Sequence, residues 1–161
     1  MLRTQFVRMT PNKVWIYQSD RFLHKIELDK IDAFMQEFVS NWKAHGVKLS
    51  ASYELLNDLF LVIKVVEDKQ NATGCSIDAS VHALKELQQQ LGVNFFNRQR
   101  VAYLNGSKIE QCSMTEFKKL AKEGVVNNET QVFNNTVITI SEFENNWIIN
   151  ADASWHKMLL N

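Results

Sequence analysis

The stretch Leu59–Val66, LFLVIKVV, is apolar at seven of its eight positions and has polar residues on both sides. A short apolar run with several β-branched residues is typical of a strand that is buried on both faces. A second run of this kind, Lys13–Gln18 (KVWIYQ), lies earlier in the chain. We therefore expect these two segments to be the central strands of a sheet that is covered on both faces.

The chain between these two runs predicts a helix and a further strand. Apolar residues recur at helical spacing over Glu27–Ala44, and Gly46 follows in the usual C-terminal position of a helix. Lys48–Leu56 instead alternates apolar and polar residues, which is typical of a strand with one exposed face. Asn57-Asp58 then fits a two-residue hairpin.

The segment after Leu59–Val66 predicts a second helix and a fourth strand. The helix is expected over Ser76–Leu91, with Ser76 as its N-cap and Gly92 after its end. Arg100–Asn105 (RVAYLN) is the expected fourth strand. The resulting β-α-β-β-α-β order indicates an α+β fold with a ferredoxin-like antiparallel sheet.

Residues 107–161 are expected to form a C-terminal helical extension of the same single domain, 1–161. Ser113 and Glu116 form a capping box for one helix. The segment 136–147 fits both a strand and a helix, and we interpret it as a helix. Because the two earlier helices cover only one face of the sheet, this extension or a second subunit must cover the other.

The overall charge argues against two classes of partner. The 161 residues include 18 basic and 18 acidic residues, a formal net charge of +0, whereas binding to nucleic acid or to an anionic membrane usually needs a basic surplus. No apolar stretch is long enough to span a membrane, and the first eleven residues lack the apolar core of a signal peptide. We therefore predict a cytoplasmic protein with free thiols at Cys75 and Cys112.

Common catalytic signatures are absent from the sequence. It has no phosphate-binding loop, no dinucleotide-binding glycine motif and no clustered metal ligands, so we expect neither a cofactor nor a metal. Trp15 and Tyr17 invite comparison with the base-stacking aromatics of RNA-binding sheets. The third strand does not match that pattern, and we interpret both rings as core residues.

The best candidate site is the segment Gly74-Cys75-Ser76-Ile77-Asp78. It places a thiol at the start of a predicted helix, where unpaired N–H groups and the helix dipole stabilise anions. The alternative interpretation is that Cys75 is a small buried residue and Ser76 an ordinary cap.

Four residues elsewhere are weaker candidates for the same ligand site. Arg98 would add positive charge if the loops converge. Trp42 and His45 lie at the end of the first helix, where the alternative is a simple helix cap. Trp155 near the C-terminus either lines a pocket or anchors the end of the chain.

Several segments together resemble a family of small uncharacterised bacterial proteins that often carry the automatic label "ABC transporter ATPase". The label does not fit this chain, which lacks the phosphate loop and signature motif of such ATPases. The resemblance implies no mechanism, but its most specific element coincides with the candidate site. The segments are Val14–Gln18, Phe38–Trp42 with His45-Gly46, Gly74–Val81 (GCSIDASV), Val132–Asn134 and Ser154-Trp155.

Three hypotheses for function follow from the sequence. The first is a non-catalytic module, ligand-binding or regulatory, that takes a small anionic ligand near Cys75 and Ser76. The second is a thiol-dependent enzyme or redox sensor that uses Cys75. The third is a structural protein whose second sheet face packs on a partner, so that a monomer and a homodimer both remain open.

Overall fold

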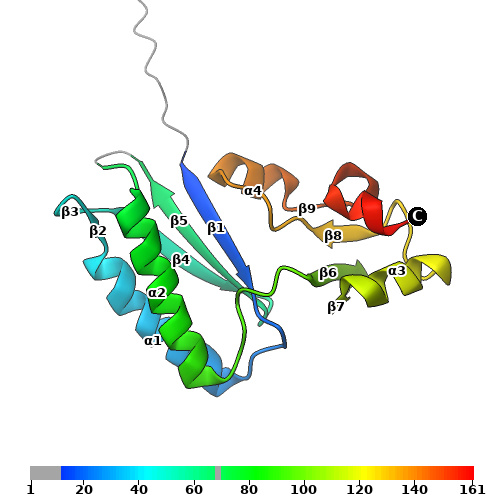
Figure 1. Cartoon of the computed structure of the whole chain (residues 1–161), viewed down its shortest axis with the longest axis horizontal. Helices are drawn as coiled ribbons and strands as arrows, with labels where there is room; N and C mark the ends of the chain where they lie inside the picture. The colour runs from blue at the N-terminus through cyan, green and yellow to red at the C-terminus, as the bar shows by residue number, and fades with distance from the viewer. Residues whose placement is uncertain (1–11, 68–69) are drawn as a thin grey trace, which may run out of the picture.

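The computed structural model describes residues 12–67 and 70–161 (Figure 1). The expected absence of a signal peptide concerns residues 1–11 and lies outside this range. The described chain is a mixed α+β structure with antiparallel sheets. In chain order, its elements are β1 (Lys13–Gln18), α1 (Lys25–Asn41), β2 (Lys43–Ala44), β3 (Val47–Lys48), β4 (Ser50–Leu56), β5 (Phe60–Val66), α2 (Gly74–Leu91), β6 (Arg100–Asn105), β7 (Lys108–Ser113), α3 (Met114–Lys122), β8 (Gln131–Phe133), α4 (Ile140–Asn146) and β9 (Ile148–Asn150), followed by two 3₁₀ turns, Ala151–Ala153 and Trp155–Leu159.

The first sheet has the strand order β1-β5-β4. Strand β5 is central, and its residues 60–63 are almost completely buried, as the apolar run predicts. Strand β1 pairs with β5 along one side only, so the expectation that it is a second central strand is wrong. The β4–β5 hairpin has a three-residue loop rather than two, because Leu56 pairs with Phe60; Asn57 and Asp58 both adopt positive φ in it.

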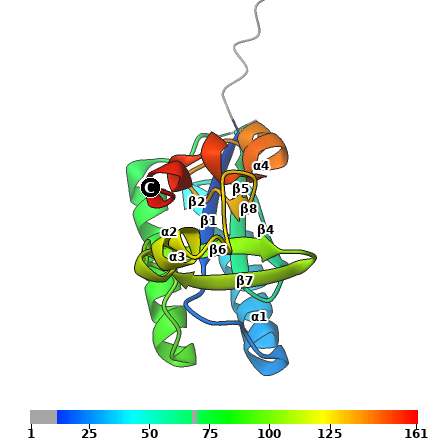
Figure 2. The same cartoon turned by 90° about the vertical axis from the view of Figure 1, so that its right-hand side faces the viewer.

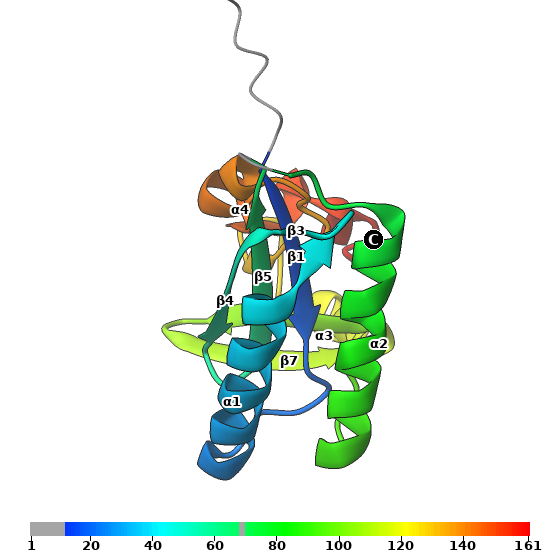
Figure 3. The same cartoon turned by 90° about the vertical axis from the view of Figure 1, so that its left-hand side faces the viewer.

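Helices α1 and α2 lie side by side over one face of this sheet (Figure 3). Helix α1 ends at Asn41, and His45-Gly46 forms the turn between β2 and β3 instead of a helix cap. Helix α2 begins at Gly74 with Thr73 as its N-cap, so the prediction that Ser76 is the cap is wrong. Thr73 and Ser76 each accept a hydrogen bond from the other's backbone N–H (3.2 and 2.7 Å), a reciprocal arrangement that satisfies two donors of the first turn.

The opposite face of the first sheet is covered by the C-terminal part of the chain, as expected. Phe60 of β5 lies 4.9 Å from Phe133 and 5.0 Å from Trp147, measured between ring centroids. The residues buried in this cluster come from both sheets and from the segments beside them: Val14, Leu59, Phe60, Val62, Ala102, Phe133, Val137 and Trp147.

The strand order does not confirm the ferredoxin-like topology. The fourth strand, β6, pairs with β7 along its length and with β8 at Tyr103–Val132, in a second sheet of order β7-β6-β8-β9. Gly106, with φ of +65°, follows β6 and allows the chain to turn back after two residues. The β6–β7 hairpin runs across the direction of the first sheet's strands (Figure 2). Residues 107–161 therefore contain three strands and are not a purely helical extension.

The ambiguous segment 136–147 contains both kinds of structure. Helix α4 occupies 140–146, and just before it Thr139 forms an isolated antiparallel bridge with Lys13 at the outer edge of β1. There the Val14 N–H donates to the Ile138 carbonyl (3.0 Å) and the Ile140 N–H to that of Asn12 (3.1 Å). Part of the edge that a ferredoxin-like fourth strand would pair is thus occupied by 138–140.

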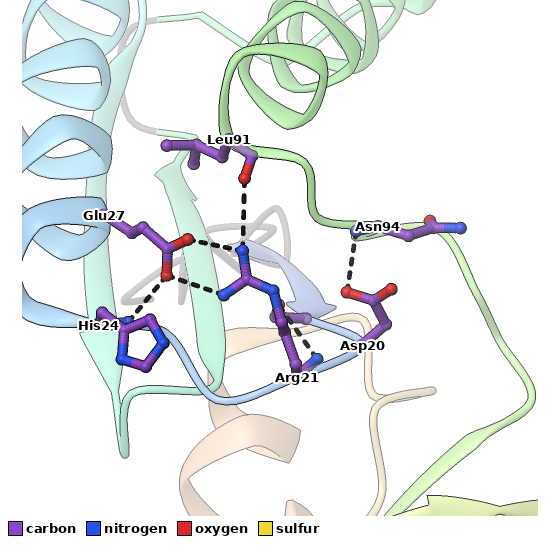
Figure 4. Close-up of polar contacts among 7 residues, drawn as sticks. Asp20, Arg21, His24, Glu27, Leu91 and Asn94 are labelled. Atoms are coloured by element: carbon purple, nitrogen blue, oxygen red, sulfur yellow. Dashed lines mark hydrogen bonds and ion pairs between the residues drawn. The ribbon is translucent and has the colours of Figure 1, made fainter.

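A polar network attaches the loop after β1 to the end of α2 (Figure 4). The Arg21 guanidinium donates to both carboxylate oxygens of Glu27 (2.9 and 2.5 Å) and to the Leu91 carbonyl (3.3 Å). Asp20 accepts a hydrogen bond from the Asn94 N–H (3.0 Å). The hydrogen bonds from Arg21 lower the pKa of Glu27 to about 2.

Within residues 12–67 and 70–161, no helix is long and apolar enough to cross a bilayer.

Candidate functional site: a cleft along the outer edge of β1

A cleft of about 1200 Å³ runs along β1, between α2 and the C-terminal part of the chain. Its floor is β1, residues 13–18, and one wall is the face of α2 that carries Ile77, Val81 and Lys85. Phe133, residues 135–139 and Trp155 line the opposite wall, and residues 95–98 with Arg100 contribute to the lining. The cleft therefore follows the side of β1 that has no neighbouring strand over most of its length.

Aromatic rings make up much of the apolar lining. Trp15 and Tyr17 project from β1 and are partly exposed, and Tyr17 meets Phe96 edge to face at 5.5 Å. Burial raises the pKa of the Tyr17 hydroxyl, an effect that the hydrogen bond with Ser80 and the nearby Arg98 charge partly offset. The neutral phenol is thus a polar group within an otherwise apolar wall.

All charged side chains that line the cleft are cationic: Lys13, Lys85, Arg98 and Arg100. Lys13 has a counterion, the carboxylate of Glu67, at 3.1 Å. Arg100 donates from Nε to the side-chain oxygen of Gln111 at 3.3 Å. Within the described part of the chain, neither Lys85 nor Arg98 forms an ion pair, so their charges are available to a ligand.

A chain of amide hydrogen bonds joins the two sheets where β1 ends. The Gln18 side chain donates to Gln111 of β7 (3.2 Å) and accepts from Asn135 (3.0 Å). Asn135 in turn accepts from the indole N–H of Trp147 (2.9 Å). Because Gln18 is buried, these bonds satisfy groups that would otherwise be costly to bury, and they fix one side of the cleft relative to the other.

Two of the residues expected at a ligand site line this cleft. Arg98 contributes charge, and Trp155 stacks on His156 with ring centroids 3.9 Å apart. Burial lowers the pKa of His156 to about 4, and the Ser154 hydroxyl lies 2.7 Å from its Nδ1. The ring behind Trp155 is therefore neutral at pH 7.

The other predicted site residues lie outside the residues that line the cleft. Gly74 and Cys75 are exposed in the first turn of α2, and a side chain added at Gly74 would meet open space. Asp78 is exposed, and Ser76 is buried as a partner of the Thr73 cap. Of the segment Gly74–Asp78, Ile77 lines the cleft together with Arg98, whereas Cys75 and Ser76 do not.

Trp42 and His45 have roles in the fold. Trp42 is buried and donates its indole N–H to the Ser76 carbonyl (2.8 Å), which joins the end of α1 to the first turn of α2. Its ring also meets Trp15 edge to face at 6.1 Å. His45 is exposed in the β2–β3 turn with φ of +50°.

The sequence interpretation missed Tyr17, Gln18 and Lys85 as site residues. Ile77, Val81 and Lys85 recur every four residues, a spacing that places them on one helix face. That spacing was a usable signal for a helix face that lines a site. Gln18 carried no periodic signal, because its role depends on residues 93 and 117 positions away.

The arrangement suits binding better than acid–base chemistry. Among the residues that the structure describes, no group of three or more His, Cys, Asp or Glu side chains could hold a metal ion. The cleft offers aromatic surface, two cations without a counterion and hydrogen-bonding amides, a combination that recognises an anion with an apolar part.

Comparison with protein-family models, with curated proteins and with solved structures found no match. The resemblance to the bacterial family named above therefore remains a prediction.

Proposed function

We propose that this protein is a non-catalytic small-ligand-binding or regulatory module whose cleft takes an anionic ligand with an aromatic or apolar part. The observation that carries the proposal is the charge of the lining, which is cationic throughout and lies beside Trp15, Tyr17 and Trp155. Arg98 and Trp155 keep their predicted roles, whereas the ligand is now assigned to the cleft rather than to Cys75.

In this proposal the apolar groups of the cleft supply most of the affinity, and the charged groups determine the preference for anions. Burial of a ligand ring against these aromatic side chains supplies affinity of about 25 cal/mol per Å² of apolar area. A carboxylate or phosphate of the ligand would meet Arg98 and Lys85, which need no existing ion pair to be broken. Such charge-assisted hydrogen bonds are roughly twice as strong as neutral ones and would set the preference for anions.

Matched pairs of ligands test this proposal by calorimetry and thermal shift. Indole-3-acetate and phenyl phosphate carry a ring and a charge, indole-3-acetamide and phenol carry the ring alone, and inorganic phosphate carries the charge alone. We expect binding by the aromatic anions and at least tenfold weaker binding by the neutral analogues and by phosphate.

Variants then locate the site. Arg98→Gln should weaken binding of the aromatic anion at least tenfold, whereas Lys118→Gln, an exposed site on α3 outside the cleft, should leave it unchanged. Absence of binding by both aromatic anions, or equal binding by the acid and its amide, would overturn the proposal.

The runner-up function is a thiol-dependent enzyme or redox sensor using Cys75. Its one supporting observation is that this thiol is exposed in the first turn of the eighteen-residue helix α2. A cytoplasmic location stays a prediction from the sequence.

A further inference from the structure

The outer edge of β1 presents unpaired backbone groups to the cleft. The Ser19 N–H donates to the Leu59 carbonyl, so the backbone N–H and C=O groups of the odd-numbered residues of β1 point towards β5. The N–H groups of Val14 and Asp20 donate instead to Ile138 and Asn94, so even-numbered residues face away from it. Because an antiparallel strand directs the N–H and C=O of one residue to the same side, Ile16 presents both groups to the cleft.

The pairing at this edge stops after Val14 and resumes only beyond the strand. Within residues 12–67 and 70–161, the Ile16 N–H has no hydrogen-bond partner on that side. The Gln18 backbone faces the same way, and both residues line the cleft. A stretch of ladder about 13 Å long is thus open, at about 3.3 Å per residue.

β1 is constructed like a central strand although it lies at an edge. Val14 and Ile16 pack towards the C-terminal part of the chain, and Trp15 and Tyr17 towards the helices, so both faces are covered. Exposed edges are usually protected by charged residues, proline or bulges, and 14–17 has none of these. The strand order β1-β5-β4 is that of a ferredoxin-like sheet without its fourth strand, and the cleft lies where that strand would be.

The positive charge of the cleft is concentrated near the carboxyl end of β1. Arg98 lies near the Tyr17 hydroxyl, and its charge lowers the pKa of that group. Arg100 and Gln18 both donate hydrogen bonds to the side-chain oxygen of Gln111. At the other end of the strand, Lys13 is neutralised by Glu67. An occupant of the open edge therefore meets unbalanced cations at one end only.

We infer that the cleft receives an extended acidic peptide segment of a partner protein, which pairs with β1 as an added strand. Its backbone bonds the N–H and C=O of Ile16, its alternate side chains lie against the aromatic lining, and its carboxylates lie beside Arg98 and Lys85. This inference rests on the proposed function, since the same cations bind the anionic group, and it specifies the ligand as a peptide.

Selection from a random eight-residue peptide library displayed on phage, with the 161-residue chain as bait, tests the inference. The enriched peptides should alternate β-branched or aromatic residues with others and should carry Asp or Glu towards one end. The best binder is then synthesised with single N-methyl groups at successive positions, which removes backbone donors and leaves the protein unchanged.

N-methylation should weaken binding at least tenfold at every second position of the paired stretch and less than twofold between them. In hydrogen exchange, the Ile16 amide should become protected when the peptide binds, whereas the amides of Trp15 and Tyr17, already facing β5, should change little. No enrichment, a uniform response to N-methylation, or no protection of Ile16 would overturn the inference. If the aromatic anions still bind in an Arg98-dependent manner in that case, the proposed function stands without the peptide; if they also fail, both fall.

Discussion

The N-terminal half of the molecule, residues 12–91, and the C-terminal half, residues 100–161, are assembled in different ways. In the first, a central apolar strand and two amphipathic helices form layers from long, regular segments. In the second, a long hairpin is extended by two three-residue strands, and β6 joins β8 through the single pair Tyr103–Val132. Long periodic segments allow the secondary structure of the N-terminal half to be predicted from sequence. The strand pairing of the C-terminal half depends on long-range contacts, which no local sequence pattern indicates.

Of the three buried apolar clusters of the described residues, one contains residues of both halves and forms their shared core. Phe60 belongs to the central strand of the first sheet, yet its ring packs against Phe133 and Trp147 of the C-terminal half. We therefore expect the halves to unfold together despite their different construction.

Among the substitutions that we propose, Phe60→Ala should have the largest effect on the stability of the two halves. Removing a completely buried ring from the contact between the halves should lower the free energy of unfolding by about 3–5 kcal/mol. Urea unfolding followed both by tryptophan fluorescence and by far-UV circular dichroism measures the change and its cooperativity.

The exposed Phe22→Ala is the matched control and should cost less than about 1 kcal/mol. Two separate transitions in the wild-type protein would contradict the shared core, as would a loss at Phe60 no greater than at Phe22.

The elements that sequence predicted correctly are those with a strong period or a full apolar run. The helix expected over 76–91 corresponds to α2, and the apolar run Leu59–Val66 predicted a strand buried on both faces. The same argument failed for β1, because burial of both faces does not require a strand on both sides. Strand β7 (KIEQCS) was missed because its mostly polar sequence lacks a clear apolar period.

The candidate site was predicted only in part for a related reason. Arg98 was chosen for its charge and Trp155 for its ring, and both line the cleft. The cleft itself exists because β6 leaves the first sheet, which depends on pairing with β7 and β8. The Cys75 segment had a strong local signal, but that signal describes a helix start and carries no information on what lies across from it.

His156 should make the C-terminal half sensitive to mild acid. Its pKa is about 4 in the folded protein and about 6.5 when unfolded, so the unfolded chain binds more protons between these values. The contribution of His156 to stability is then complete above pH 6.5 and falls by about 3 kcal/mol as the pH drops to 4. Chemical denaturation at a series of pH values measures this slope.

His156→Gln should be less stable than the wild type at pH 7 but should have a flatter profile between pH 6.5 and 4. His82→Gln, at an exposed position of α2, should retain the wild-type slope. An unchanged slope in the His156 variant would assign the acid sensitivity to other groups.

Glu27 should make the stability of the N-terminal half depend on pH as well, but by a smaller amount and at a lower pH than His156 does. Its pKa of about 2 lies below the ordinary value of 4.5, so its contribution is complete above pH 4.5 and is lost as the pH falls towards 2. Because Arg21 is partly exposed, we expect only about 1 kcal/mol. Glu27→Gln should lose this amount at pH 7, and Glu37→Gln, exposed on α1, should lose almost none; equal losses would exclude a specific role for the pair.

The prediction with the smallest expected effect concerns the reactivity of one thiol in each half. Cys75 is exposed, whereas Cys112 is buried and burial raises its pKa to about 11. Iodoacetamide at pH 8 should therefore label one cysteine per folded chain, with Cys112 reacting only in denaturant. Cys75→Ser should abolish native labelling, and labelling of Cys112 in that variant would show that the C-terminal half opens separately from the shared core.

The same reagent separates the two proposed functions, because only a thiol-dependent role requires Cys75 to be a thiolate near neutral pH. The pH profile of its alkylation in the Cys112→Ala variant gives the midpoint directly. A midpoint well below 8.5 would support the thiol hypothesis, since the thiolate is the reactive form. Reaction only above pH 8.5 would exclude it and leave the cleft, which has no cysteine in its lining, as the functional site.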